Sequence, residues 1–372
     1  MFLQQSGARF TAPPSFIHRL ALLTASLLFS FLLGCANNSG PSAETEWKQI
    51  TLSGATMGTS YHVKVVVPST ENPDSEAIKQ EIDSDLAQFN KLLSTYDPDS
   101  ELSRFNQHRS TEPFPVSPQT LEVVRAAYEI YHQSGGVFDP SVSPLIDLWG
   151  FGSQGSKLEP PSAKAIEEAT SAIGMNRLAI AEDSLSKEIP DLQLNLSAIA
   201  KGYGVDVIAN VLFDEGFEDL MVEIGGEVVV RGKNLKRQPW TIGVDSPNQA
   251  PGQRNLIETL SLDDCAVATS GDYRNAFEYN GRLYSHIIDP RTGWPIPESV
   301  KSVTVIAPTC MVADGAATAI MALGAEKGLK WAEERKDLDA LVFVKDDEKE
   351  FERLQTSGME KYLYNQNKQD VP

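Results

Sequence analysis

The sequence predicts an α+β fold, a single domain in which a mixed or antiparallel sheet is flanked by helices. Three observations support this class. Strand-like segments outnumber helical ones, several strand segments follow one another directly, and Asn280-Gly281 marks a hairpin. Consecutive strands are typical of antiparallel sheets, whereas doubly wound parallel folds alternate strands with helices.

The first 34 residues are typical of a secretory signal peptide. Arg9 and Arg19 precede an apolar run over residues 20–33, and this stretch contains no acidic residue. The run is shorter than the roughly 20 residues that a membrane-spanning helix needs. It ends in Leu-Leu-Gly-Cys, which resembles the bacterial lipobox, so we expect cleavage before Cys35 and lipidation of its thiol. The alternative is an ordinary signal peptide with an incidental cysteine.

The rest of the chain divides into a tether, a domain and a tail. Residues 35–46 are small and polar, which predicts a flexible lipidated tether. Residues 47–359 form the predicted domain, and 360–372 form a polar tail. The formal net charge of −19 argues against binding to nucleic acid or to anionic lipid. An acidic protein that handles a phosphate ester needs local positive charge, from a metal ion or a lysine.

Apolar spacing and capping residues predict the regular elements in chain order. Ser117-Pro118 is a helix start, and Gly135-Gly136 is a helix end. The predicted helices span residues 75–93, 118–133, 161–173, 199–213 and 311–323. The predicted strands span residues 59–67, 192–196, 220–224, 228–231, 277–279, 283–288, 300–306 and 341–344.

Several common kinds of site are absent from the sequence. It has no HExxH, no CxxC pair, no GxxxxGK phosphate loop and no GxSxG elbow. These absences exclude the corresponding zinc, nucleotide and hydrolase motifs. Cys265 and Cys310 lie in apolar surroundings, so we expect two buried free thiols, with a disulfide as the alternative.

Asp314 and Thr318 are four residues apart in an alanine-rich helix. This spacing places a carboxylate and a hydroxyl on one helix face. Both are hard oxygen ligands of the kind that Mg²⁺ prefers. Alternatively, Asp314 is a helix N-cap and Thr318 bonds back to a carbonyl.

Two further positions could take part in phosphate chemistry. Lys201 follows a predicted strand-to-helix turn, where backbone N–H groups and an ammonium group could bind an anion. His286 ends a predicted strand next to a Pro/Gly turn and could act as a base near neutral pH. Taken singly, these patterns favour a solvated lysine and a structural histidine.

Sequence blocks in a fixed order give a more specific indication. The blocks are ATMGT, STYDPDSELSRFN, GGVFDPSVSPL, LNLSAIAKGYGVD, EIGGEVVVRG, VATSGDYRN, SHIIDPRTGWP and ADGAATAIMALG. With these blocks the chain resembles the FAD:protein FMN transferase (ApbE) family from about residue 47 to residue 345. The lipoprotein start before residue 47 also suits that family.

The resemblance implies a single domain that binds FAD in a cleft, with Mg²⁺ at the pyrophosphate. It implies His286 and Asp314 as catalytic residues. Position 195 is often Asp in the family and is Asn here, so we expect flavin affinity to change more than the chemistry. The implied FAD-binding residues are Met57, Tyr96, Val137, Phe138, Asp139, Asn195, Lys201 and Ile288, and the implied metal site comprises Ala198, Asp314, Ala317 and Thr318.

The activity implied by the resemblance is transfer of FMN from FAD to a threonine or serine hydroxyl of a partner protein. Implied partners are flavin-acceptor subunits of membrane electron-transfer complexes, of the NADH:quinone reductase or Rnf type. With Cys35 as anchor, we expect a location on the periplasmic side of the inner membrane, with the outer membrane as the alternative. Alternative functions are an FAD pyrophosphatase and a non-enzymatic flavin-binding lipoprotein.

Overall fold

A computed structural model describes residues 45–152, 159–247, 255–271, 276–296, 299–346 and 351–364. The predicted signal peptide, Cys35 and nearly all of the predicted tether lie outside the described residues. Within the described ranges, no helix combines the length and apolar character needed to cross a membrane.

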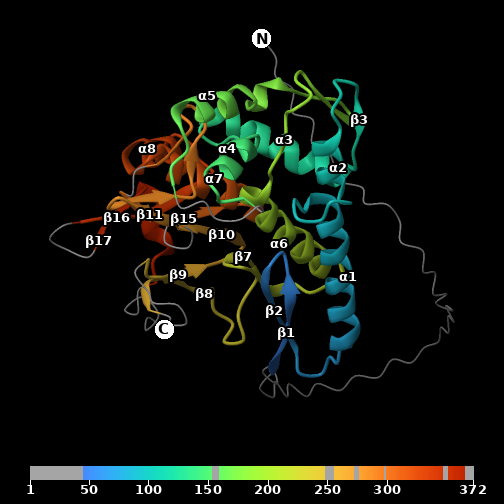
Figure 1. Ribbon diagram of the computed structural model, residues 1–372. Coiled ribbons are helices and arrows are strands. Elements are labelled where there is room, and N and C mark those ends of the chain that lie inside the picture. The colour runs from blue at the N-terminus through green and yellow to red at the C-terminus, as the bar shows by residue number, and fades with distance from the viewer. Residues whose placement is uncertain are drawn as a thin grey trace, which may run out of the picture. The chain divides into compact units, whose positions relative to one another are not determined.

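The domain is built on one large sheet of eight strands (Figure 1). Every pairing between neighbouring strands described in this sheet is antiparallel, so the antiparallel form of the predicted sheet is the one adopted. In spatial order the strands are β1 (Trp47–Thr56), β2 (Thr59–Pro68), β6 (Asp219–Ile224), β7 (Glu227–Arg231), β10 (Cys265–Gly271), β15 (Val300–Ala307), β16 (Asp339–Lys345) and β17 (Phe351–Gln355).

Both faces of this sheet are buried, because neighbouring apolar residues along a strand point to opposite faces. On β2, Val65 packs in one hydrophobic cluster and Val66 in another. On β16, the neighbours Leu341 and Val342 likewise belong to different clusters, and Leu341 shares its cluster with Val66. The sheet therefore divides the core into two layers.

Helices cover one of the two faces. In Figure 1, α6 and α7 lie between the strands and helices α3, α4 and α5, and α1 flanks the end formed by β1 and β2. The predicted helices at 75–93 and 118–133 are confirmed with the same bounds. The helices are α1 (Ser75–Leu93), α2 (Glu101–Gln107), α3 (Pro118–Gln133), α4 (Ser143–Leu148), α5 (Ala163–Ser171), α6 (Ser197–Asp214), α7 (Cys310–Leu323) and α8 (Ala325–Glu333).

The other face is covered by a two-stranded ribbon, β8 (Trp240–Asp245) and β9 (Leu256–Leu262), and by the 3₁₀ helix η3 (Ser357–Tyr362). Met359 of η3 is fully buried, and Leu363 forms a bridge to Leu260. The packing therefore continues past the predicted domain boundary at 359, because the side chains of Tyr362 and Leu363 pack against the same hydrophobic cluster as Met359.

Small elements complete the domain. The hairpin predicted at Asn280-Gly281 is present, and both turn residues have the positive φ that such a tight turn requires. Cys265 and Cys310 are free and buried, as expected. The remaining elements are β3 (Phe114–Pro115), η1 (Met175–Arg177), β4 (Leu178–Ile180), β5 (Ser184–Lys187), β11 (Ala276–Tyr279), β12 (Arg282–Ser285), β13 (Ile288–Asp289) and β14 (Trp294–Pro295).

The strand predicted at 192–196 is wrong. This segment belongs to no strand and no helix. The side-chain amide of Asn106 bonds both the N–H and the carbonyl of Leu194 at 2.8 Å, and the N–H of Asn195 donates to Pro140. These hydrogen bonds replace the ones that a neighbouring strand would make. They fix the segment just before the start of α6.

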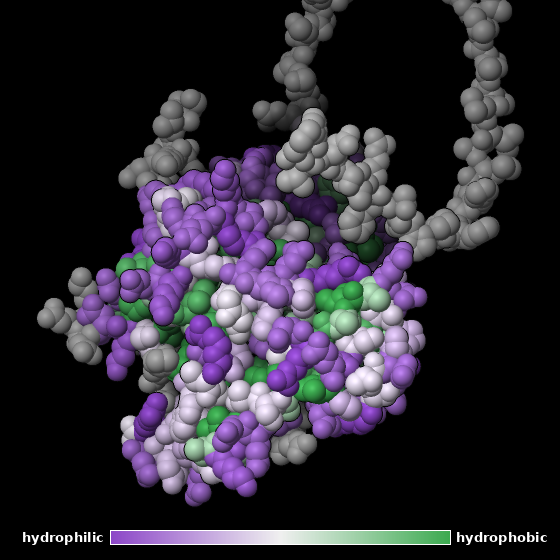
Figure 2. All heavy atoms as spheres, turned by 90° about the horizontal axis from the view of Figure 1, so that it is seen from above, coloured by the Kyte–Doolittle hydropathy of each residue, from purple (hydrophilic) through white to green (hydrophobic). Residues whose placement is uncertain are grey.

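The face seen in Figure 2 is largely hydrophilic, with apolar side chains in separate patches. This distribution fits a strongly acidic chain.

Candidate active site

A cavity of about 340 Å³ lies where α6, α7 and the turn between β6 and β7 meet. It brings together most of the residues expected at the flavin and metal sites. Its lining includes Val137, Phe138, Asp139, Asn195, Ser197, Ala198, Lys201, Gly225, Glu227, Ser270, His286, Ile288, Asp314 and Thr318.

Close packing of α6 against α7 forms the floor of this site. A Cβ atom at Gly202 would lie 2.3 Å from the carbonyl oxygen of Cys310, so only glycine permits this approach. Asp206, one turn further along α6, accepts the N–H groups of Cys310 and Met311 at 2.8 Å. These are first-turn donors of α7 that lack a partner within the helix. The two contacts fix the register of the helices, which places Lys201 beside Asp314.

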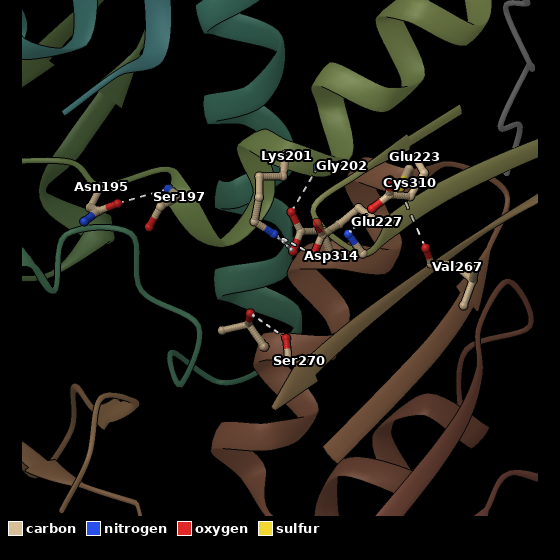
Figure 3. Close-up of polar contacts among 12 residues, drawn as sticks. Asn195, Ser197, Lys201, Gly202, Glu223, Glu227, Val267, Ser270, Cys310 and Asp314 are labelled. Atoms are coloured by element: carbon tan, nitrogen blue, oxygen red, sulfur yellow. Dashed lines mark hydrogen bonds and ion pairs between the residues drawn. The ribbon is translucent and has the colours of Figure 1, made fainter. Parts of the chain in front are cut away.

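Lys201, Glu227 and Asp314 point toward one another in the cavity (Figure 3). Lys201 Nζ lies 2.5 Å from Glu227 Oε1 and 3.9 Å from Asp314 Oδ1. Asp314 Oδ2 accepts the N–H of Gly202 at 3.0 Å. Both carboxylates are almost fully buried. When all three groups are ionised the cluster carries one net negative charge, which favours an additional cation.

Burial and mutual charge interactions shift the pKa values of all three groups in this cluster. Burial, together with repulsion from Asp314, raises the pKa of Glu227 to about 7, although the ion pair with Lys201 opposes the shift. Burial also raises the pKa of Asp314. Burial acts to lower the pKa of Lys201, but the two carboxylates outweigh this effect and leave that pKa raised. Lys201 is therefore a permanent positive charge at neutral pH.

Asp314 is not a helix N-cap, so that alternative is wrong. The N-cap of α7 is Thr309, whose side chain accepts the N–H of Val312. Asp314 lies in the second turn of α7. It is buried from bulk solvent and lines the cavity. Thr318 lies four residues later, and its hydroxyl is 3.3 Å from that of Ser270 on β10.

The oxygen atoms around Asp314 suit a hard divalent cation such as Mg²⁺. In a regular helix the N–H of Gly202 is directed at the carbonyl of Ala198, and this same N–H donates to Asp314. The Ala198 carbonyl and the Asp314 carboxylate therefore lie close together. Ala317 is fully buried on the same turn of α7 as Thr318. Within the described part of the chain, no three His, Cys, Asp or Glu side chains cluster as metal ligands, so a metal would depend on backbone and hydroxyl oxygens as well.

Asn195 and Asp139 shape the entrance to α6. The side-chain oxygen of Asn195 accepts the N–H of Ser197 at 3.0 Å, which satisfies a donor at the start of the helix. The carboxylate of Asp139 accepts both the N–H and the hydroxyl of Ser141, at 2.8 and 2.6 Å. Asp139 thus stiffens the loop over residues 137–141, and its carboxylate is already engaged.

A second cavity of about 410 Å³ adjoins the first. Asn195, Ser197 and His286 line both cavities. Tyr96 lines only the second and is 80% exposed. The predicted flavin-binding residues are therefore distributed over two connected spaces, with His286 at their junction.

Met57 and Glu227 differ from the sequence-based expectation. Met57 lines neither cavity and packs against Gly204 of α6. Glu227 was not expected at the site, although it is the nearest carboxylate to Lys201. The signal that could have identified it is the Gly225-Gly226 pair, which turns the chain back so that the next residue faces α6.

Comparisons with known proteins show the family of the chain. The sequence model of the ApbE family matches residues 57–342. A curated FAD:protein FMN transferase of Vibrio cholerae is 44% identical over 342 residues, covering 91% of this chain and 97% of the relative. The corresponding Escherichia coli protein is 36% identical, with coverage of 83% and 87%.

Solved structures give the same result. The flavin transferase ApbE from Vibrio cholerae superposes with a TM-score of 0.78 at 43% identity, covering 85% of this chain and all of the other. The apo flavinyl transferase ApbE of Pseudomonas stutzeri gives a TM-score of 0.78 at 37% identity, with coverage of 86% and 98%. Family match, sequence identity and fold agree over nearly the whole domain, and the chain therefore belongs to the ApbE family.

Proposed function

We propose that this chain is an FAD:protein FMN transferase, which moves the FMN part of FAD to a hydroxyl group of a partner protein and releases AMP. The relatives that carry this name match along most of their length. The observation that carries the proposal is the convergence of Lys201, Asp314 and Thr318 in one cavity. Phosphoryl chemistry depends on positioning and charge stabilisation, and these groups supply both.

Lys201 binds the pyrophosphate in this proposal. An acidic protein must concentrate positive charge locally to hold an anionic substrate. Lys201 stays protonated because its two carboxylate neighbours raise its pKa, and a bound divalent cation would change the net charge of the cluster from −1 to +1. The ammonium group of Lys201 would stabilise the charge that develops on the phosphate oxygens.

Asp314, Thr318 and the carbonyls of Ala198 and Ala317 would hold Mg²⁺. A bound Mg²⁺ supplies electrophilic stabilisation of the phosphate oxygens. The residues fit this role because they are hard oxygen donors on facing turns of α6 and α7, around a cluster with excess negative charge.

His286 would act as the base. A threonine or serine hydroxyl oxygen of the acceptor forms a bond to the phosphorus on the FMN side, and the bond from that phosphorus to the AMP oxygen breaks. The hydroxyl proton passes to His286, which lies where the two cavities meet. At this location His286 can reach an acceptor hydroxyl at the phosphorus while FAD extends along both cavities.

The proposed setting is the periplasmic side of the inner membrane. A lipid on Cys35 would hold the enzyme beside acceptor subunits of membrane electron-transfer complexes of the NADH:quinone reductase or Rnf type. A tethered enzyme searches a surface and not a volume, which raises its effective concentration toward membrane-bound partners. Labelling cells with an alkyne fatty acid tests the anchor, because Cys35→Ala should lose the label.

One incubation tests the activity. The protein from residue 47 onward is mixed with FAD, Mg²⁺ and an acceptor domain that carries a reactive threonine. Flavin fluorescence on the acceptor after denaturing electrophoresis supports the transferase. AMP and FMN released equally with and without acceptor would indicate a pyrophosphatase, and no product would indicate a flavin carrier.

The metal assignment has its own test. Asp314→Ala should lower the rate of flavin transfer by at least about 100-fold, since it removes a metal ligand. Asp337→Ala is the matched control, because this carboxylate pairs with Arg335 and lines neither cavity. A rate for Asp314→Ala within a few-fold of wild type would show that the assignment is wrong.

A further inference from the structure

The ammonium group of Lys201 is shared unequally between its two carboxylate neighbours. It lies at hydrogen-bond distance from Glu227, at 2.5 Å, and beyond that distance from Asp314, at 3.9 Å. Lys201 reaches the cavity from α6, and both carboxylates could serve as its partner. The arrangement leaves Asp314 Oδ1 without a close ion pair to Lys201.

Glu227 is held firmly in this position. It is 3% exposed and begins β7, directly after the Gly225-Gly226 turn. Glu223 secures the turn from the other strand by accepting the N–H of Gly226 at 2.7 Å. Among the described residues, Glu227 Oε2 has no hydrogen-bond partner although it is buried. A buried carboxylate with an unsatisfied oxygen is costly, which points to a role at the cavity.

We infer that Glu227 is a positioning residue that draws Lys201 away from Asp314 and so keeps Asp314 available to a divalent cation. A lysine that pairs closely with Asp314 would compete with the metal for the same oxygen. Glu227 prevents this by offering the lysine a nearer partner on a rigid strand. The inference rests on the proposed function, in which Asp314 is a metal ligand.

Two variants of Glu227 separate positioning from charge. Glu227→Gln removes the charge and releases Lys201, and it should weaken cation binding roughly 10- to 100-fold, as loss of an outer partner of a metal site does. Glu227→Asp keeps the charge but draws the carboxylate back by one methylene, which breaks the 2.5 Å contact. If positioning is the role, Glu227→Asp also weakens cation binding, by about 10-fold.

The experiment measures Mn²⁺ binding to the folded protein by the electron paramagnetic resonance signal of the free ion. It needs neither FAD nor acceptor. Glu223→Gln is the matched control, because it removes a carboxylate from the same β6–β7 hairpin outside the cavity, while its amide oxygen can still accept the N–H of Gly226 and keep the turn in place. This control should bind Mn²⁺ like wild type. Thermal unfolding verifies that each variant is folded. If Glu227→Gln does not fold, Glu227→Asp still tests the inference, because it preserves the buried charge.

Weakened binding in both Glu227 variants, with Glu223→Gln unchanged, supports the inference. Wild-type affinity in Glu227→Asp overturns it, whatever Glu227→Gln shows. A wild-type protein that binds no Mn²⁺ would overturn the metal site and this inference together. A wild-type protein that binds Mn²⁺ but transfers no flavin would overturn the proposed function alone.

Discussion

Asp206 on α6 accepts the N–H of Cys310 at 2.8 Å and thereby joins the two helices that carry Lys201 and Asp314. The same carboxylate also accepts the N–H of Met311. A side chain of one helix thus caps the start of the other. The site depends on this contact even though Asp206 itself lines neither cavity.

The ionisation of Asp206 should make stability depend on pH. Burial raises its pKa to about 6, although the hydrogen bonds from Met311 and Cys310 oppose the shift. The folded state therefore binds the proton more tightly than the unfolded state, whose carboxyl has a pKa of about 4. The resulting stabilisation is fully present below about pH 4 and is lost as pH rises through about 6.

Asp206→Asn removes this titration and isolates its effect. From pH 4 to pH 7, wild type should lose about 1 to 3 kcal/mol of unfolding free energy relative to Asp206→Asn. Urea unfolding of both proteins across this range measures the difference. Parallel stability curves for the two proteins would mean that Asp206 has an ordinary pKa.

Gly202 and Gly204 allow a comparison on one helix. The Cβ of Gly202→Ala would meet the backbone of Cys310 and push α6 from α7, which should cost about 1 to 3 kcal/mol and sharply reduce flavin transfer. The Cβ of Gly204→Ala would meet Met57 Cε, the end of a flexible side chain that can move. Its cost should be smaller. Urea unfolding and transfer assays measure the stability and activity of both variants. Equal losses in Gly202→Ala and Gly204→Ala would contradict this prediction.

His286→Gln should reduce the rate of transfer roughly 10²- to 10⁴-fold, the usual contribution of a positioned base. The affinity for FAD, measured by quenching of flavin fluorescence, should stay within a few-fold of wild type, because the change removes a proton acceptor and not a phosphate contact. His132→Gln on α3 serves as the control, since His132 lines neither cavity. A rate unaffected by His286→Gln would assign the base to another group.

Asn195→Asp should change flavin affinity more than the maximal rate. An aspartate can still accept the N–H of Ser197, so the start of α6 should remain intact. The new charge would lie in the cavity that holds the anionic substrate, where it should weaken FAD binding unless the flavin presents a donor to it. Titration with FAD and saturation kinetics separate the two effects. A change confined to the maximal rate would contradict the assignment of Asn195 to binding.

Local patterns predicted much of the fold. The caps and apolar spacing of α1 and α3 depend only on neighbouring residues, and the hairpin at Asn280-Gly281 depends on one turn. The prediction of a strand at 192–196 was wrong because the alternating leucines are buried in the core without a neighbouring strand. The backbone of Leu194 instead bonds the side chain of Asn106, 88 residues away. A partner so distant in the sequence cannot be inferred from the spacing of neighbouring residues.

The site was predictable where the family blocks named its residues and unpredictable where it depends on pairing between elements. Asp314 and Lys201 were found, and they lie side by side. The role of Glu227 arises only when the β6–β7 turn meets α6 and α7. In the same way, the division of Tyr96 and Lys201 between two cavities depends on how loops distant in sequence pack together.

The alternation of apolar residues across the central sheet has a consequence for variation in this enzyme. One layer carries the helices and the reacting groups, and the other layer packs under the β8–β9 ribbon and η3. Substitutions in the ribbon layer can adjust heat tolerance and cellular lifetime while the chemistry on the helical side stays constant. The two properties can therefore evolve, or be engineered, on opposite sides of the same strands.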